Sequence, residues 1–90
     1  MEAGKRPIPN RLRMHRKMMG HKQRHVATLL GLYDTKPLSM WENGITIPST
    51  INLLKLSIIY RTFPNELYYE HFIELREELK ALELHQFINQ

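Results

Sequence analysis

Apolar residues recur most regularly between positions 22 and 44 of the chain. The first half of this stretch holds an apolar stripe at near-helical spacing, formed by Val26, Ala27, Leu29 and Leu30. Gly31 follows directly, and a glycine commonly ends a helix because it tolerates a left-handed backbone. In the second half, Leu38 and Trp41 lie three positions apart and predict the inward face of another helix. The stretch therefore predicts two short helices joined by a tight turn at Gly31, with Trp41 in the core.

The same spacing predicts three more helices outside this stretch. The first spans residues 11 to about 19, with Asn10 as its cap. The next spans roughly residues 50–60 after the cap Ser49, and its wide apolar face is formed by Ile51, Leu53, Leu54, Leu56 and Ile58. The last begins near Pro64 and runs unbroken to about residue 87. Apolar and polar residues nowhere alternate for long, so we expect an all-α fold, in which Ile45 and Ile47 also cover the core.

The two central helices have unusual starts. The first spans about residues 22–30, and Lys22 occupies its cap position. A lysine cannot accept the free backbone N–H groups of a helix start, so this end should be weaker by about 1 kcal/mol. The second begins between Asp34 and Pro37 and runs to about Asn43. Pro37 is tolerated only in a first turn and pushes Lys36 away from helical geometry, so we expect this helix to begin late.

These elements together form the pattern of a helix-turn-helix, whose second helix enters the major groove of DNA. Their order and spacing resemble the phage-repressor-like (XRE-type, Cro-repressor-type) helix-turn-helix regulators over roughly residues 11–68. The resemblance is carried by Gln23, Val26-Ala27, Leu29-Leu30-Gly31, Trp41-Glu42-Asn43-Gly44, Ile47-Pro48-Ser49, Leu53-Leu54-Lys55-Leu56 and Glu66-Leu67. It implies a five-helix, lambda-repressor-like domain with an extended C-terminal helix. The loop between Gly31 and Leu38 is one residue longer than in the commonest family form.

The resemblance also implies roles for individual residues. Gln23 and its neighbourhood would contact DNA phosphates, and the candidates are Lys22, Gln23, Arg13, Arg24 and Asn43. Base edges would be contacted from the second motif helix and its approach by Thr35, Lys36, Ser39 and Met40. Arg16 would pair with Glu42 and tie the first helix to the end of the recognition helix.

The charges of the chain are unevenly distributed. Residues 1–40 carry nine Lys/Arg and two Asp/Glu, a net +7, whereas residues 41–90 carry four Lys/Arg and seven Glu, a net −3. The basic half contains the helix-turn-helix, which favours a polyanionic partner such as duplex DNA. Ninety residues make one domain, and we divide the chain into a flexible basic arm (1–9), the DNA-binding domain (10–70) and a C-terminal helical extension (71–90). Lys5 and Arg6 of the arm either contact DNA or belong to a disordered start.

Other functions have little support in the sequence. Without cysteine there is no disulfide framework, thiol catalysis or zinc finger, and no apolar run could span a membrane or serve as a secretory signal. His21 and His25 lie four apart, but no third ligand is fixed nearby, so we expect no metal, no cofactor and no catalytic residue. The resemblance implies a cytoplasmic regulator of bacterial, phage or mobile-element type.

Several partners remain open for this chain. We expect a homodimer on a double-stranded DNA operator, held by the apolar surplus of the C-terminal half: Leu75, Leu79, Leu82 and Phe87. That helix could instead fold back on its own core, or fray after Ala81. An antitoxin-type autorepressor, and an adaptor whose C-terminal helix binds an unidentified protein, are the alternative functions.

Overall fold

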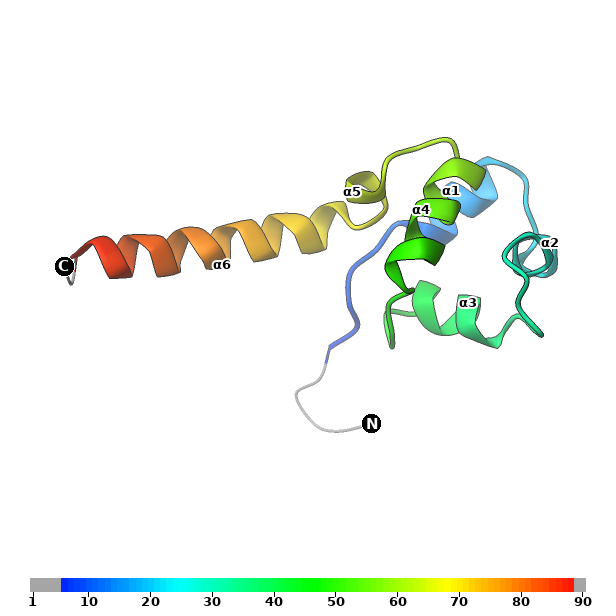
Figure 1. Cartoon of the computed structure of the whole chain (residues 1–90), viewed down its shortest axis with the longest axis horizontal. Helices are drawn as coiled ribbons and strands as arrows, with labels where there is room; N and C mark the ends of the chain where they lie inside the picture. Colours follow the sequence, from blue (N-terminus) through cyan, green and yellow to red (C-terminus); the bar gives the residue numbers. More distant parts are fainter. Residues whose placement is uncertain (1–5, 89–90) are drawn as a thin grey trace.

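The computed structural model describes residues 6–88, and all the regular structure of this part of the chain is helical (Figure 1). The helices are α1 (Leu12–Met18), α2 (Gln23–Leu29), α3 (Lys36–Glu42), α4 (Thr50–Ile59), α5 (Pro64–Leu67) and α6 (Tyr69–Ile88). The predicted all-α class is therefore confirmed. Six helices stand where five were predicted, because the last predicted helix is divided in two.

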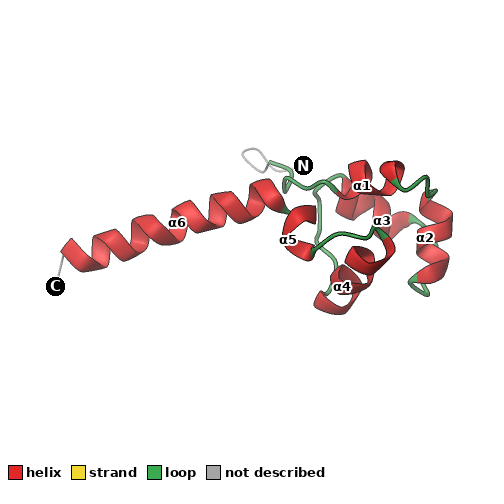
Figure 2. Cartoon of the chain, turned by 90° about the horizontal axis from the view of Figure 1, so that it is seen from above, coloured by secondary structure: helices red, strands yellow, loops and turns green. Residues whose placement is uncertain are grey.

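Helices α1 to α5 enclose a small core, and α6 projects away from them (Figures 1 and 2). The buried apolar residues are Leu12, Val26, Ala27, Leu30, Leu38, Trp41, Leu56, Tyr60 and Leu67. Trp41 is 6% exposed, so its predicted place in the core is confirmed. The core thus joins the two motif helices to α1, α4 and α5.

Several apolar residues that were predicted to be buried are exposed. They are Leu29 of α2, Ile45 and Ile47 of the next connection, and Ile51, Leu54 and Ile58 of α4. The predicted apolar face of α4 is confirmed at Leu56, which is fully buried, and was wrong at Ile51, Leu54 and Ile58. The helix turns Leu56, Ser57 and Tyr60 toward the core, so the three wrongly predicted residues lie on its opposite side and are 46% to 75% exposed.

The predicted turn at Gly31 is present, with φ +72° directly after α2. Gly44 has φ +73° at the end of α3, and it also allows the N-terminal segment to approach closely. A Cβ at Gly44 would lie 2.5 Å from the carbonyl oxygen of Ile8, whose N–H donates to the Gly44 oxygen over 2.9 Å. Pro7 and Ile8 therefore pack on the end of α3, although we predicted a flexible arm there.

The rest of that predicted arm has a different contact or lies outside the described residues. Arg6 forms an exposed ion pair with Glu74 of α6 over 2.7 Å, so in this structure its charge faces the protein. Lys5 lies outside the described residues.

The predicted continuous helix from residue 64 to 87 is interrupted at Tyr68, so that prediction was wrong. Tyr68 has φ −123° and ψ 39°, which is not helical. Directly before it, Leu67 is fully buried, and its carbonyl oxygen accepts the N–H of Arg11 over 2.7 Å. This anchor fixes α5 against α1, and the change of direction at Tyr68 sends α6 outward.

Candidate nucleic-acid interface

Helix α3 has two faces with opposite roles. Leu38 and Trp41 are buried, and the 3.6-residue period places four of the predicted DNA contacts on the other side of the helix. These are Lys36, Ser39, Met40 and Asn43, all of them exposed or partly exposed. The structure thus brings together three of the four predicted base-contacting residues on one accessible face. The fourth, Thr35, is partly buried and directly precedes the helix.

Helix α3 begins within the predicted range of Asp34 to Pro37, but the prediction that Pro37 pushes Lys36 away from helical geometry was wrong. Lys36 is its first residue and Pro37 its second, so Pro37 does not keep Lys36 out of the helix. The N–H of Lys36 donates to the side chain of Asp34 over 3.0 Å. This short turn supplies the first free N–H of the helix with an acceptor and starts the helix directly before the proline.

The buried carboxylate of Glu42 joins three elements of the motif. Its oxygens accept from Arg16 Nε over 2.6 Å and Arg16 Nη2 over 3.1 Å, so the ion pair implied by the resemblance is present. Gln23 Nε2 at the start of α2 donates to the same carboxylate over 3.0 Å, and Arg13 Nε over 3.3 Å. Burial by itself would raise the pKa of Glu42, but these donors outweigh it and lower the pKa below its usual range.

The Glu42 cluster also gathers three of the predicted phosphate contacts. Arg13 Nη2 donates to the side-chain oxygen of Asn43 over 2.7 Å, so Arg13, Gln23 and Asn43 surround one end of α3. The amide of Gln23 has a second N–H, so its bond to Glu42 orients the side chain and leaves a donor for a phosphate. The other two predicted phosphate contacts, Lys22 and Arg24, are exposed beside Gln23.

The basic residues of the N-terminal half divide into two groups. Arg11 pairs with Glu66 over 2.7 Å and also with Glu70, while His15 lies 3.0 Å from Glu66. These hydrogen bonds, first that of His15 and then that of Arg11, lower the pKa of Glu66. The second group is Lys17, Lys22, Arg24 and Lys36, for which no ion pair is found within residues 6–88. These four cations therefore lie on or beside α1, α2 and α3, which also carry the predicted DNA contacts.

A family model described as helix-turn-helix matches residues 12–67, from α1 to α5. The chain belongs to the XRE/lambda-repressor-like helix-turn-helix family. This family consists of DNA-binding transcription regulators and is not typically enzymatic. Searches of curated proteins and of solved structures returned no match. Within residues 6–88, no helix combines the length and the apolar character needed to cross a membrane.

One candidate of this helix-turn-helix surface was not predicted from the sequence. Tyr33 lies in the connection between α2 and α3 and is fully exposed, at 102% of its reference area. Its place in the short connection of a helix-turn-helix was the available signal, although Leu29 and Leu30 precede it at helical spacing. Its hydroxyl could donate to a DNA phosphate next to the residues that precede α3.

The histidines that suggested a metal site have another arrangement. The rings of His21 and His25 contact each other, with their centres 5.1 Å apart. No group of three or more His, Cys, Asp or Glu residues suited to a metal occurs in the part of the chain that the structure describes.

Proposed function

We propose that this chain is a sequence-specific transcription repressor that binds duplex DNA as a homodimer, with α3 in the major groove. The observation that carries the proposal is the accessible face of α3, which presents Lys36, Ser39 and Met40 together while Leu38 and Trp41 anchor the opposite face. A rigid helix with short polar, cationic and thioether side chains on one side suits direct contact with base edges. We propose that the protein acts in the bacterial cytoplasm and that its gene is of bacterial, phage or mobile-element type.

The proposed contacts fall into two classes. Lys36 donates to guanine O6 or N7, Met40 contacts a thymine methyl, and Ser39 and Thr35 supply weaker polar contacts. Phosphates are bound by the residues around the start of α2 and the end of α3: Lys22, Gln23, Arg24, Arg13 and Asn43. The Glu42 cluster supports this assignment, because it holds Arg13, Gln23 and Asn43 in one place before DNA arrives.

Selection of bound sequences from a random duplex pool, followed by two lysine variants, tests the proposal. Lys36→Ala should relax the preference at one base pair and cost about 1–3 kcal/mol there. Lys22→Ala should weaken all duplexes about equally and reduce the slope of log K against log salt by about 1. Lys80→Ala on α6 is the matched control and should change neither quantity.

Two outcomes would contradict the assignment. If Lys36→Ala leaves the selected motif unchanged while Lys22→Ala alters one base position, the two roles are reversed. If the wild type selects no motif and binds no duplex at low salt, the DNA-binding proposal fails. Fusing the selected operator to a reporter promoter then tests repression, for which we expect lower expression when the protein is present.

The exposed apolar residues of α6 also favour a contact with protein. An antitoxin-type autorepressor would use α6 for a toxin and α3 for its own operator. An adaptor would use α6 and bind no DNA. Steep weakening of duplex binding with salt supports both DNA-binding versions and excludes the adaptor.

A further inference from the structure

Helix α6 carries an exposed apolar stripe with the spacing of a coiled coil. Phe72, Leu75, Leu79 and Leu82 alternate at intervals of three and four residues, which is the a/d pattern of two helices that pack along each other. All four side chains are between 45% and 59% exposed. Phe87, which we had grouped with them from the sequence, lies off this stripe.

The charged residues beside the stripe distinguish between orientations of a second α6. In a parallel pair, Glu78 would face Glu83 of the other copy twice, and these like charges repel. In an antiparallel pair that places Leu79 opposite Leu82, Arg76 faces Glu83 at both ends. If the second α6 were shifted by seven residues toward the first domain, Arg76 would face Arg76 and Glu78 would face Glu78, and these like charges would repel. The antiparallel register with Leu79 opposite Leu82 therefore combines two such leucine layers with opposite charges, and it places Leu75 opposite Gln86.

We infer that two copies of this chain pair through α6 as an antiparallel coiled coil, with Leu79 against Leu82 and Arg76 against Glu83 of the second copy. Arg76 and Glu83 suit this role because neither has an ion pair within the described residues 6–88. The inference deepens the proposed function and rests on it, because it names the surface through which the proposed homodimer forms. In this register the two α6 helices begin about 34 Å apart along their axes, at 1.5 Å per residue, and the two DNA-binding domains lie beyond those ends (Figure 1).

The root of α6 is held firmly enough to transmit such a spacing. Arg11 of α1 pairs with Glu66 and Glu70, and its guanidinium lies 4.7 Å from the ring centre of Tyr69. Arg6 adds an ion pair to Glu74. These contacts join the first turns of α6 to the DNA-binding domain from one side.

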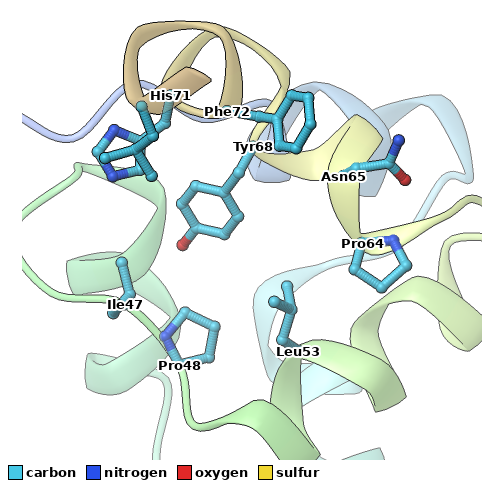
Figure 3. Close-up of a pocket in the computed structure, with 9 residues that line it drawn as sticks. Ile47, Pro48, Leu53, Pro64, Asn65, Tyr68, His71 and Phe72 are labelled. Carbon is cyan, nitrogen blue, oxygen red and sulfur yellow. The ribbon is translucent and has the colours of Figure 1, made fainter. Parts of the chain in front are cut away.

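An apolar groove of about 270 Å³ lies at the same root (Figure 3). Ile47, Leu53 and Tyr68 line it, together with Phe72 and Leu75 from the start of the α6 stripe. The groove is thus continuous with the stripe, and the last turns of the second α6 would pass over Leu75. Such a contact would cover apolar surface that the single chain leaves open.

Charge reversal on the full chain tests the orientation directly. Sedimentation equilibrium should find a wild-type dimer, and Arg76→Glu and Glu83→Arg should each raise its dissociation constant about tenfold or more, since two attractive pairs become repulsive. An equimolar mixture of the two variants should dimerise like the wild type, because both pairs of the mixed dimer again join a glutamate to an arginine. Lys80→Glu and Glu77→Arg are the matched controls on the outer face and should leave the dimer unchanged.

The possible contrary results are distinct. A wild-type protein that sediments as a monomer overturns the inference. A dimer that neither charge reversal weakens also overturns it, and its interface would lie elsewhere, for example on Ile51, Leu54 and Ile58 of α4. A Glu83→Arg variant that dimerises more tightly indicates a parallel pair, because it removes the contact between Glu78 and Glu83. Binding of the same variants to a single half-site duplex is measured separately. A monomer that still binds this duplex leaves the proposed function intact, while a dimer that binds no duplex contradicts that function alone.

Discussion

At the scale of single residues, Glu42 has the most connections in the DNA-binding domain. Its carboxylate is fully buried and accepts hydrogen bonds from Arg16, Gln23 and Arg13. A buried carboxylate is tolerated only with such partners, and removal of either member of a buried pair leaves the other uncompensated. The residue therefore couples the stability of the fold to the positions of Arg13 and Gln23, two of the predicted phosphate contacts.

Glu42→Gln should lower the free energy of unfolding by about 3 kcal/mol at pH 7. Since the folded state lowers the pKa of Glu42, its stabilising effect is complete above the unfolded pKa of 4.5 and is lost as the pH falls through the folded pKa. The difference between wild type and variant in urea unfolding should therefore narrow from pH 7 to pH 2. A difference that stays constant would show that the charge of Glu42 contributes nothing. Glu77→Gln, on the exposed side of α6, is the control with little effect.

Only part of the Glu42 cluster could be predicted from the sequence. The Arg16–Glu42 pair follows from a family resemblance, because both residues occupy recognisable positions around Gly20 and Trp41. The bond from Gln23 to Glu42 joins residues 19 positions apart on different helices, and no local pattern specifies it. Leu29 illustrates the opposite case, since its apolar character suggested burial while the crossing of α2 and α3 left it exposed.

At the scale of helices, the backbone at the start of α2 has the conformation of a helix cap, but the side chain at that position cannot accept a capping hydrogen bond. Lys22 has φ −86° and ψ 153°, the extended conformation of a helix cap, and its side chain makes no capping hydrogen bond. By contrast, Ser49 caps α4 by accepting the N–H of Asn52 over 3.2 Å. Position 22 therefore lacks the capping hydrogen bond that position 49 has, and the proposed phosphate contact of Lys22 would offset this loss only in the DNA complex.

Lys22→Ser should therefore change stability and DNA binding in opposite directions. The new hydroxyl can accept a free N–H at the start of α2 and should raise the free energy of unfolding by about 1 kcal/mol. Loss of the cation should weaken binding to every duplex. Lys17→Ser removes the same charge inside α1, where it provides no cap, and should not stabilise the protein. Thermal unfolding and duplex titration measure both effects, and a destabilised Lys22→Ser variant would contradict the capping argument.

Helix positions followed well from the sequence, and helix ends less well. Gly31 and Ser49 specify a helix end and a helix start by local chemistry, and the structure has both where predicted. The interruption at Tyr68 was missed because residues 64–87 contain neither glycine nor an internal proline. The bond from Arg11 to the Leu67 carbonyl is a tertiary contact, and it anchors the chain where the local pattern predicts a continuous helix.

At the scale of the whole molecule, charge and apolar surface are separated in space. Four cations without an ion pair within residues 6–88 lie on or beside α1 to α3: Lys17, Lys22, Arg24 and Lys36. The apolar stripe lies on α6, which points away from them (Figure 1). Two copies joined through α6 would keep the cationic surfaces apart. A dimer formed by the motif helices would instead bring like charges together.

The proposed DNA binding and the α6 pair together lead to a prediction about operator spacing. A coiled coil that fixes the separation of the two domains should allow only one half-site spacing. Inserting about 5 bp between the selected half-sites turns them to opposite faces of the duplex, and inserting about 10 bp moves them one helical turn further apart. Both insertions should reduce the affinity of the wild type to that of a single half-site.

The monomeric Arg76→Glu variant supplies the control, because it should bind all three duplexes equally weakly. Fluorescence anisotropy with labelled duplexes at one fixed salt concentration compares the affinities directly. Recovery with the insertion of about 10 bp would mean that the connection between the domains is flexible, since only the face of the duplex would then matter. Equal wild-type affinity for all three spacings would mean that each domain binds independently, and the α6 pair would have no part in operator recognition.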